Sequence, residues 1–174
     1  MDEFLQKITK GLTVVDVVFT NDKIQFHLND GRYIACPLSW FPYMANADKA
    51  KRAYFEADDF TIAFPKIDEY FSIRGLFYHS DTHKADMDAA RKSKNLQAFI
   101  AILTAPLAIT NAVQEGEKII VQINDGREFA FPAQWLGNLP AHTHFQVVPD
   151  GKSVTWDGGK FDLSFLFLPV KQVE

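Results

Sequence analysis

The chain has 174 residues, 47% of them hydrophobic and 14% aromatic, with a formal net charge of −4. This composition supplies a packed core and excludes a disordered chain, while the negative charge argues against a broad nucleic-acid-binding surface. The single cysteine, Cys36, excludes an internal disulfide and a cysteine-rich zinc site, and its apolar neighbours indicate a buried side chain. No apolar stretch reaches the roughly 20 residues of a membrane span, and the opening residues MDEFLQKITK show no signal-peptide pattern. We therefore expect a cytoplasmic protein without membrane contact.

The first elements predicted along the chain form a β-hairpin. Residues 24–28 alternate apolar and polar side chains, as a half-buried strand does. The sequence Asn-Asp-Gly-Arg follows at 29–32, and an Asp-Gly pair is typical of a hairpin turn whose two central residues take positive φ. The next strand ends at Pro37, which has no N–H to donate to a neighbouring strand. We expect the Asp-Gly pair to fix the strand register rather than to serve catalysis.

A short helix and two further strands are predicted after the hairpin. Two alanines and a tyrosine recur at helical spacing over 46–54, with Asn46 as the N-cap. The strands are expected at 60–64 and within 71–77. A longer helix is predicted within 80–106, because an apolar stripe recurs at i, i+3, i+4 and i+7 and Pro106 ends the run. The stripe consists of Leu96, Phe99, Ile100 and Leu103.

The rest of the chain repeats its beginning. Aligning Asp30 with Asp125, an offset of 125 − 30 = 95, gives nine identities in the eighteen positions of 23–40 and 118–135, where chance gives about one. We infer an internal duplication with a first α+β repeat at 1–79, a bridging helix at 80–106 and a second α+β repeat at 107–174. The predicted fold class is α+β: two homologous lobes with antiparallel sheets and short helices, related by a pseudo-twofold axis like a fused dimer.

These motifs resemble the domain-of-unknown-function family 2442. The resemblance rests on Asp-Gly-Arg at 30–32 and 125–127, on the Pro-x-x-Trp segments that start at Pro37 and Pro132, and on the strand patterns that follow each of them. It implies a small bacterial α+β domain, sometimes joined to a helix-turn-helix or found beside toxin-like partners. The family has no established catalytic residues, so none is carried over to this chain.

Catalytic signatures are missing from the sequence. It contains no G-x-G-x-x-G, no G-x-x-x-x-G-K-[ST] and no G-x-S-x-G. His79 and His83 form one histidine pair and His142 and His144 form another, but the first pair lacks the glutamate of a zincin helix, and we place the four in polar turns. We therefore predict that the protein is not an enzyme and holds neither a metal nor a cofactor.

Two arginines and two tryptophans are the candidate binding residues. Arg32 and Arg127 each follow a hairpin turn, and a guanidinium group suits a carboxylate or phosphate. The alternative is that each arginine pairs with a nearby acid or caps a backbone carbonyl. Trp40 and Trp135 either close one end of a core or serve as interface anchors.

Our first functional hypothesis is a non-enzymatic binding or regulatory module that recognises another protein, such as a toxin, a regulator or a phage-defence component. Exposed aromatic residues in the groove between the lobes, or on an edge strand, would carry this interaction. The alternative is a small-molecule or nucleotide binder that uses the groove between the lobes, with Arg32 or Arg127 as the anion clamp. A histidine-based hydrolase is the third reading. Nucleic acid is not expected as a partner.

Overall fold

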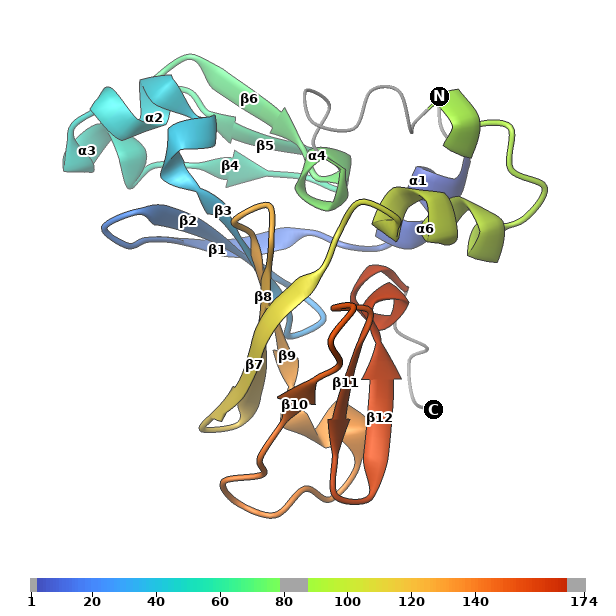
Figure 1. The fold of residues 1–174 in the computed structure, drawn as a ribbon. Coiled ribbons are helices and arrows are strands. Elements are labelled where there is room, and N and C mark those ends of the chain that lie inside the picture. Colours follow the sequence, from blue (N-terminus) through green and yellow to red (C-terminus); the bar gives the residue numbers. More distant parts are fainter. Residues whose placement is uncertain (1–2, 79–87, 169–174) are drawn as a thin grey trace.

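The computed structural model describes residues 3–78 and 88–168. It consists of short helices and antiparallel strands, which confirms the predicted α+β class (Figure 1). The first half contains α1 (Glu3–Thr9), β1 (Val14–Phe19), β2 (Lys23–Leu28), β3 (Tyr33–Pro37), η1 (Leu38–Trp40), α2 (Pro42–Asn46), α3 (Lys49–Arg52), β4 (Glu56–Ala57), β5 (Thr61–Phe64), β6 (Glu69–Ser72) and α4 (Arg74–Phe77). After α6 (Leu96–Thr104), the second half contains β7 (Ile109–Glu115), β8 (Lys118–Ile123), β9 (Glu128–Pro132), η2 (Ala133–Leu136), β10 (Gln146–Val147), β11 (Ser153–Trp156), β12 (Gly159–Asp162) and η3 (Leu163–Phe167).

The two halves share one central sheet. Its strand order is β1-β2-β3-β9-β8-β7, so the last strand of each three-stranded meander pairs with the last strand of the other. The sequence did not predict this junction, because the alternation within a strand shows which face is buried but not which strand lies along its edge. Each half also has a small three-stranded sheet, β4-β5-β6 or β10-β11-β12. Figure 1 shows the first small sheet over the β1–β3 side and the second beside the β7–β9 side.

The pairing at the junction is symmetric under the sequence offset of 95. Ile34 pairs with Phe129, its own counterpart in the repeat, and the flanking pairs are Tyr33 with Ala130 and Ala35 with Glu128. The edge strands repeat the same irregularity: the register shifts between Val14 and Asp16 in β1, and between Ile109 and Asn111 in β7. The two halves therefore contact each other through equivalent positions, related by the offset of 95.

One large hydrophobic core contains residues of both halves. It includes Phe26 of β2, Val121 of β8 and Phe77 of α4, all without exposed surface. Cys36 is also buried, as predicted, and burial raises the pKa of its thiol to about 12, with Asp125 adding to that rise and Arg127 opposing it. The thiol therefore stays protonated and unreactive in the folded protein.

Helix α6 lies between α1 and η3 (Figure 1). Its predicted apolar stripe is buried at Phe99, Ile100 and Leu103, and the Phe99 ring lies 5.4 Å from that of Phe4 in α1. The helix begins at Leu96, later than the sequence indicated, because the Asn95 side chain accepts a hydrogen bond from the Ala98 N–H and caps it. Part of the predicted 80–106 helix, residues 80–87, lies outside the described residues.

Two local predictions need correction. Asn46 ends α2 instead of capping a helix, and Asp48 caps α3 by accepting a hydrogen bond from the Lys51 N–H. An extended Ala47 separates the two helices. In the first hairpin turn only Gly31 has a positive φ, of 95°. The loop is a β-turn over residues 28–31, closed by a hydrogen bond from the Gly31 N–H to the Leu28 carbonyl, and only its last residue takes the left-handed conformation.

Candidate functional site

Both predicted arginines are buried at the junction of the two halves. Arg32 is 4% exposed and Arg127 is 1% exposed. Each guanidinium group pairs with the aspartate two residues earlier: the Nε of Arg32 donates to Asp30 Oδ2 at 2.8 Å, and the Nε of Arg127 donates to Asp125 Oδ2 at the same distance. The Nη2 atom of each arginine also lies 2.8 Å from that oxygen.

The remaining end of each guanidinium group reaches the opposite half. Arg127 Nη1 donates to the Leu76 and Phe77 carbonyls of the first half at 2.9 and 3.0 Å. Arg32 Nη1 donates to the Leu166 and Leu168 carbonyls of the second half at 3.3 and 3.4 Å. The structure therefore realises both parts of the alternative: each arginine pairs with an acid of its own half and caps backbone carbonyls of the opposite half.

The predicted tryptophans belong to the same two clusters. The guanidinium carbon of Arg127 lies 6.0 Å from the ring centre of Trp40, and that of Arg32 lies 5.8 Å from Trp135. Both tryptophans are half-buried. The structure thus groups the four candidate residues as two arginine–tryptophan pairs, each formed by residues from both halves, and gives both arginines protein partners.

The other residues of the repeated motif have structural partners as well. Asn29 accepts a hydrogen bond from the Thr13 N–H and donates to the Gly11 carbonyl, and Asn124 does the same with Ala108 and Pro106. These bonds fix the chain that enters the first strand of each meander. The Asn-Asp-Gly-Arg sequence is therefore accounted for by the fold, residue by residue.

The sequence analysis missed an aromatic surface on the first half. Among residues 3–78 and 88–168, every largely exposed aromatic side chain lies there: Tyr43, Tyr54, Phe60 and Tyr70. Tyr54 and Tyr70 belong to the outer face of the first small sheet. Tyr70 is opposite Ala63, which in turn is opposite Glu56, and the Tyr54 hydroxyl donates a hydrogen bond to Glu56. We call Tyr54, Glu56, Ala63 and Tyr70 the tyrosine face.

The matching face of the second half is polar. Strand pairing places Gln146 opposite Thr155, and Thr155 opposite Lys160. These residues correspond to Glu56, Ala63 and Tyr70, and His144 stands two residues before Gln146 as Tyr54 does before Glu56. A position-by-position comparison of the two small sheets would have revealed the tyrosine face from the sequence. Such a comparison requires the correct alignment of these strands, and few of their residues are identical between the two halves.

A hollow of about 460 Å³ lies on the second half, and we call it the tryptophan groove. Trp135 lines it, together with Lys160 and Asp162, whose Nζ and Oδ1 atoms form an ion pair 3.2 Å apart. The apolar lining consists of Trp135, Leu136, Trp156, Phe161, Phe165 and Leu168.

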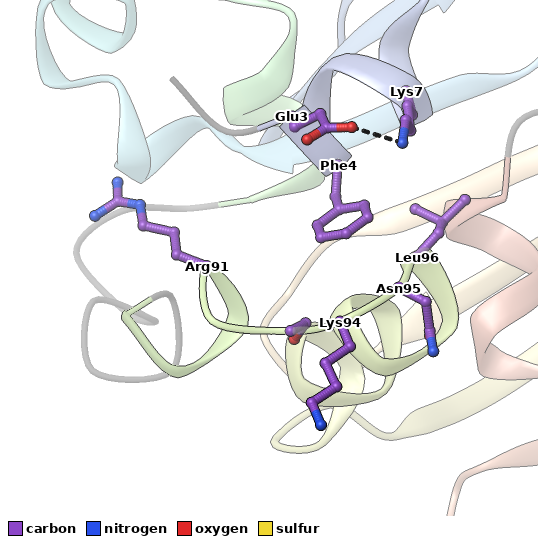
Figure 2. Close-up of a pocket in the computed structure, with 8 residues that line it drawn as sticks. Glu3, Phe4, Lys7, Arg91, Lys94, Asn95 and Leu96 are labelled. Atoms are coloured by element: carbon purple, nitrogen blue, oxygen red, sulfur yellow. Dashed lines mark ion pairs between the residues drawn. The ribbon is translucent and has the colours of Figure 1, made fainter.

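A larger hollow, of about 750 Å³, lies between α1 and the segment that leads into α6 (Figure 2). Its charged groups do not converge: Lys7 pairs with Glu3 at 2.8 Å, Arg91 pairs with Asp88 at 3.2 Å, and Figure 2 shows Arg91 and Lys94 pointing in different directions. In a ligand site, several polar groups point toward one position. The polar groups of this hollow do not.

A polar cluster covers the junction on the open face of the central sheet. The Tyr33 hydroxyl donates to Glu128 Oε1 at 2.8 Å, Lys118 Nζ lies 5.3 Å from the Tyr33 ring centre, and the His27 ring packs against Tyr33. Burial, followed by the hydrogen bond to Glu128, raises the pKa of Tyr33, and burial, followed by the positive charge of Lys118, lowers the pKa of His27. The histidine is thus held neutral and the tyrosine protonated, so neither serves as a charged ligand group near pH 7.

The predicted histidines form no metal centre among the described residues. His142 and His144 are exposed before β10, while His79 and His83 lie outside the described residues. Within 3–78 and 88–168, no three His, Cys, Asp or Glu side chains are grouped so that they could hold a metal ion. In the same ranges, no helix is both long and apolar enough to cross a membrane.

The fold and the two clusters define a class: an α+β protein whose two halves share one antiparallel sheet and exchange arginine contacts. Residues 14–82 match the model of the family described as "Protein of unknown function (DUF2442)". This match supports the resemblance seen in the first repeat; it spans less than half of the chain, and the second half lies outside it. No curated protein and no solved structure matches the chain.

Proposed function

We propose that the protein is a non-enzymatic module that binds another protein through the tyrosine face of its first half. A toxin, a regulator or a defence component remains the class of partner that the family resemblance implies. In this proposal the second half is a diverged copy of the same domain, which completes the shared sheet and the arginine contacts.

The observation that supports the proposal is the difference between two equivalent surfaces. Tyr70 is 60% exposed and Tyr54 is 44% exposed, where the second half has Lys160 and His144. Exposed tyrosines are enriched at protein interfaces, because the ring buries a large area at low entropic cost and the hydroxyl still finds a polar partner. The fold does not need aromatic residues here, since the second half is built without them.

The arginine clamp of the small-molecule alternative has less support. Each guanidinium group is buried and already held by an aspartate and two backbone carbonyls. A nucleotide phosphate would have to displace those partners. The segments of the opposite half that supply the carbonyls would then lose their contact with the arginines. Protein binding at an exposed face requires no such rearrangement.

Exchanging the tyrosines for their counterparts in the second half tests the proposal. The double variant Tyr54→His, Tyr70→Lys is expected to fold normally, because both side chains are exposed and their replacements are found on an equivalent sheet. Partners captured by the wild type from host lysate would be identified by mass spectrometry, produced separately and titrated by calorimetry. We expect the double variant to bind at least about 30-fold more weakly, the loss typical of removing an interface hot spot.

The matched control is Thr155→Ala, which gives the second small sheet the residue that the tyrosine face has at Ala63. This variant is expected to bind the partner like the wild type. If the wild type and the double variant bind the partner with equal affinity and have the same melting temperature, the tyrosine face does not bind the partner.

A further inference from the structure

The edges of the three sheets differ in whether another strand can pair with them. An edge strand presents unpaired N–H and C=O groups, and folded proteins protect such edges with very short strands, bulges, charged side chains or covering segments. The central sheet ends at β1 and β7, the first small sheet at β4 and β6, and the second at β10 and β12. Within the described part of the chain, each of these edges except β6 has one of these protections.

Both edges of the central sheet are closed near their start. The register shifts there in β1 and in β7. In β1 the Val17 N–H donates to the side chain of Asp16 at 2.8 Å. In β7 the Ile109 N–H donates to the Gly151 carbonyl at 2.8 Å, and β10 and β11 pack against the strand. An added strand would have to displace these groups.

Three of the outer edges of the small sheets are protected as well. Strands β4 and β10 contain two residues each, too few for a continuous ladder of hydrogen bonds. Strand β12 has Lys160 and Asp162 on one face, where they form an ion pair with each other. Charged side chains on an edge oppose pairing, because an added strand would remove them from water.

Strand β6 has the hydrogen-bonding pattern of β12 with uncharged residues at its edge. The Ile73 N–H donates to the Phe60 carbonyl at 3.0 Å, and the alternation of an antiparallel pair then turns the N–H and C=O groups of Tyr70 and Ser72 away from β5. Strand pairing places these two residues at the positions of the charged pair in β12. Both are exposed. The edge of β6 is therefore open to a further strand.

The inner face of β6 indicates which segment fits. Phe71 is half-buried on this face, with its ring 4.7 Å from that of Phe41. Glu69 lies two positions earlier in the strand and so belongs to the same face. None of the ion pairs between described residues includes Glu69. In an added strand, an apolar side chain opposite Phe71 extends the packing, and a lysine or arginine opposite Glu69 forms a pair of opposite charges.

We propose that the partner protein adds an extended segment to the edge of β6, as a fourth and antiparallel strand of the first small sheet. Its backbone bonds to Tyr70 and Ser72, and its inner side chains are an apolar residue opposite Phe71 and a basic residue opposite Glu69. This proposal rests on the proposed function, since it states how the partner binds beside the tyrosine face. In this mode the main-chain bonds supply affinity, and the alternate side chains supply specificity.

The probe is the acetylated and amidated peptide TTIAKT, titrated into the full chain. Its Thr-Ile-Ala segment repeats residues 61–63 of β5, which pair with Ser72, Phe71 and Tyr70, and its lysine lies opposite Glu69. We expect the peptide to shift the NMR signals of the Tyr70 and Ser72 amides and to slow their hydrogen exchange, with a Kd on the order of 1 mM. The Phe71 amide, which faces β5, should change little.

Two N-methylated forms of the peptide are the matched controls. In this register the alanine N–H of the peptide donates to the Tyr70 carbonyl, whereas the isoleucine N–H points away from β6. Methylation of the alanine nitrogen is expected to weaken binding at least about tenfold, because it removes a hydrogen bond and places a methyl group between the strands. Methylation of the isoleucine nitrogen should leave the affinity unchanged. The two peptides have the same composition, so the difference reports on the backbone bond.

The protein variant is Ser72→Pro, which deletes an N–H of the edge. Proline is tolerated in an edge strand where the N–H faces solvent, and the variant should bind the peptide at least about tenfold more weakly. Asp162→Pro makes the same change in β12 and should bind like the wild type. If Ser72→Pro fails to fold, Ser72→Asp, which gives β6 the residue of β12, replaces it with the same expected loss.

Several outcomes would overturn the proposal. They are the absence of binding, binding without protection of the Tyr70 and Ser72 amides, equal affinity of the two N-methylated peptides, and equal binding by the wild type and the folded Ser72→Pro variant. Self-association of the wild type, measured by analytical ultracentrifugation and lost in Ser72→Pro, would also overturn it, because the occupant would then be a second copy of the chain.

The tyrosine face and the edge of β6 are judged by separate results. If Tyr54→His, Tyr70→Lys weakens binding of the partner and Ser72→Pro does not, the tyrosine face is upheld and strand addition is rejected. If the peptide binds at β6 as expected but the partner binds the wild type and the double variant equally, the edge accepts a strand and the proposed function fails.

Discussion

At the scale of single residues, each of the four residues of the repeated Asn-Asp-Gly-Arg motif has its own structural role. The asparagine fixes the preceding chain, the aspartate pairs with the arginine, the glycine takes the left-handed turn conformation, and the arginine holds the end of the other half. The sequence allowed the pairing of each arginine with a nearby acid to be foreseen, because the two are only two positions apart. The sequence also allowed for capping of a backbone carbonyl, but it did not indicate which carbonyls, since Arg127 and Leu76 are distant in sequence and no side chain marks a backbone acceptor.

The two arginines are expected to differ in their contribution to stability. Arg127 bonds at 2.9 and 3.0 Å and its partner Asp125 is 9% exposed, whereas Arg32 bonds at 3.3 and 3.4 Å and Asp30 is 17% exposed. Arg127→Met leaves a buried carboxylate without its partner and should lower the free energy of unfolding by about 3–5 kcal/mol. Arg32→Met should cost less, about 1–3 kcal/mol.

Urea denaturation of both variants beside the wild type measures these losses. Equal losses, or a larger loss for Arg32→Met, would contradict the ranking drawn from the distances and the exposure of the aspartates.

At the scale of elements, the two hairpin turns pack against the opposite half. A Cβ atom added at Gly126 would lie 2.8 Å from Cγ of Pro37, and one added at Gly31 would lie 3.0 Å from Cγ of Pro132. The proline that ends each third strand therefore rests against the hairpin turn of the other half. The sequence predicted the turns, the strand ends and the apolar stripe of α6, because these follow from local patterns. The sequence did not predict the start of α6 or the N-cap of α3. At both places, several polar residues that could serve as the N-cap lie within three positions of one another.

Gly126→Ala is expected to be more harmful than Gly158→Ala. Both glycines have positive φ, 95° and 96°, but nothing lies within 4 Å of a Cβ atom added at Gly158. The control variant should lose about 1–2 kcal/mol from backbone strain alone. Gly126→Ala adds the contact with Pro37 and should lose about 2–4 kcal/mol. Melting curves of the two variants give the comparison, and losses of equal size would show that Pro37 moves away freely.

At the scale of the whole molecule, the two halves are joined by the pairing of β3 with β9, by the reciprocal arginine contacts and by one continuous core. The sequence predicted two homologous lobes but not this shared sheet, because matching sequence segments do not indicate how the two halves pair with each other. It also did not reveal the tyrosine face or the tryptophan groove, since both depend on which strand positions face outward.

We expect the protein to unfold in one cooperative transition. If one half unfolds, the other loses the partners of its arginine and half of the central sheet. Partly folded states are therefore much less stable than the native state. Differential scanning calorimetry should give a single peak whose calorimetric and van't Hoff enthalpies agree. Arg127→Met should move this peak to lower temperature without dividing it; two separate peaks in the wild type would show that the halves are independent folding units.

The register centred on Ile34 and Phe129 has a consequence for how this molecule can change over evolutionary time. In an assembly of two identical chains, every substitution appears twice, so a new contact surface on one side is forced on the other. Here the two sides of the junction are encoded by separate stretches of one chain, and a substitution alters only one of them. One side is thus free to acquire tyrosines and the other a groove, while the residues that hold the sides together stay matched.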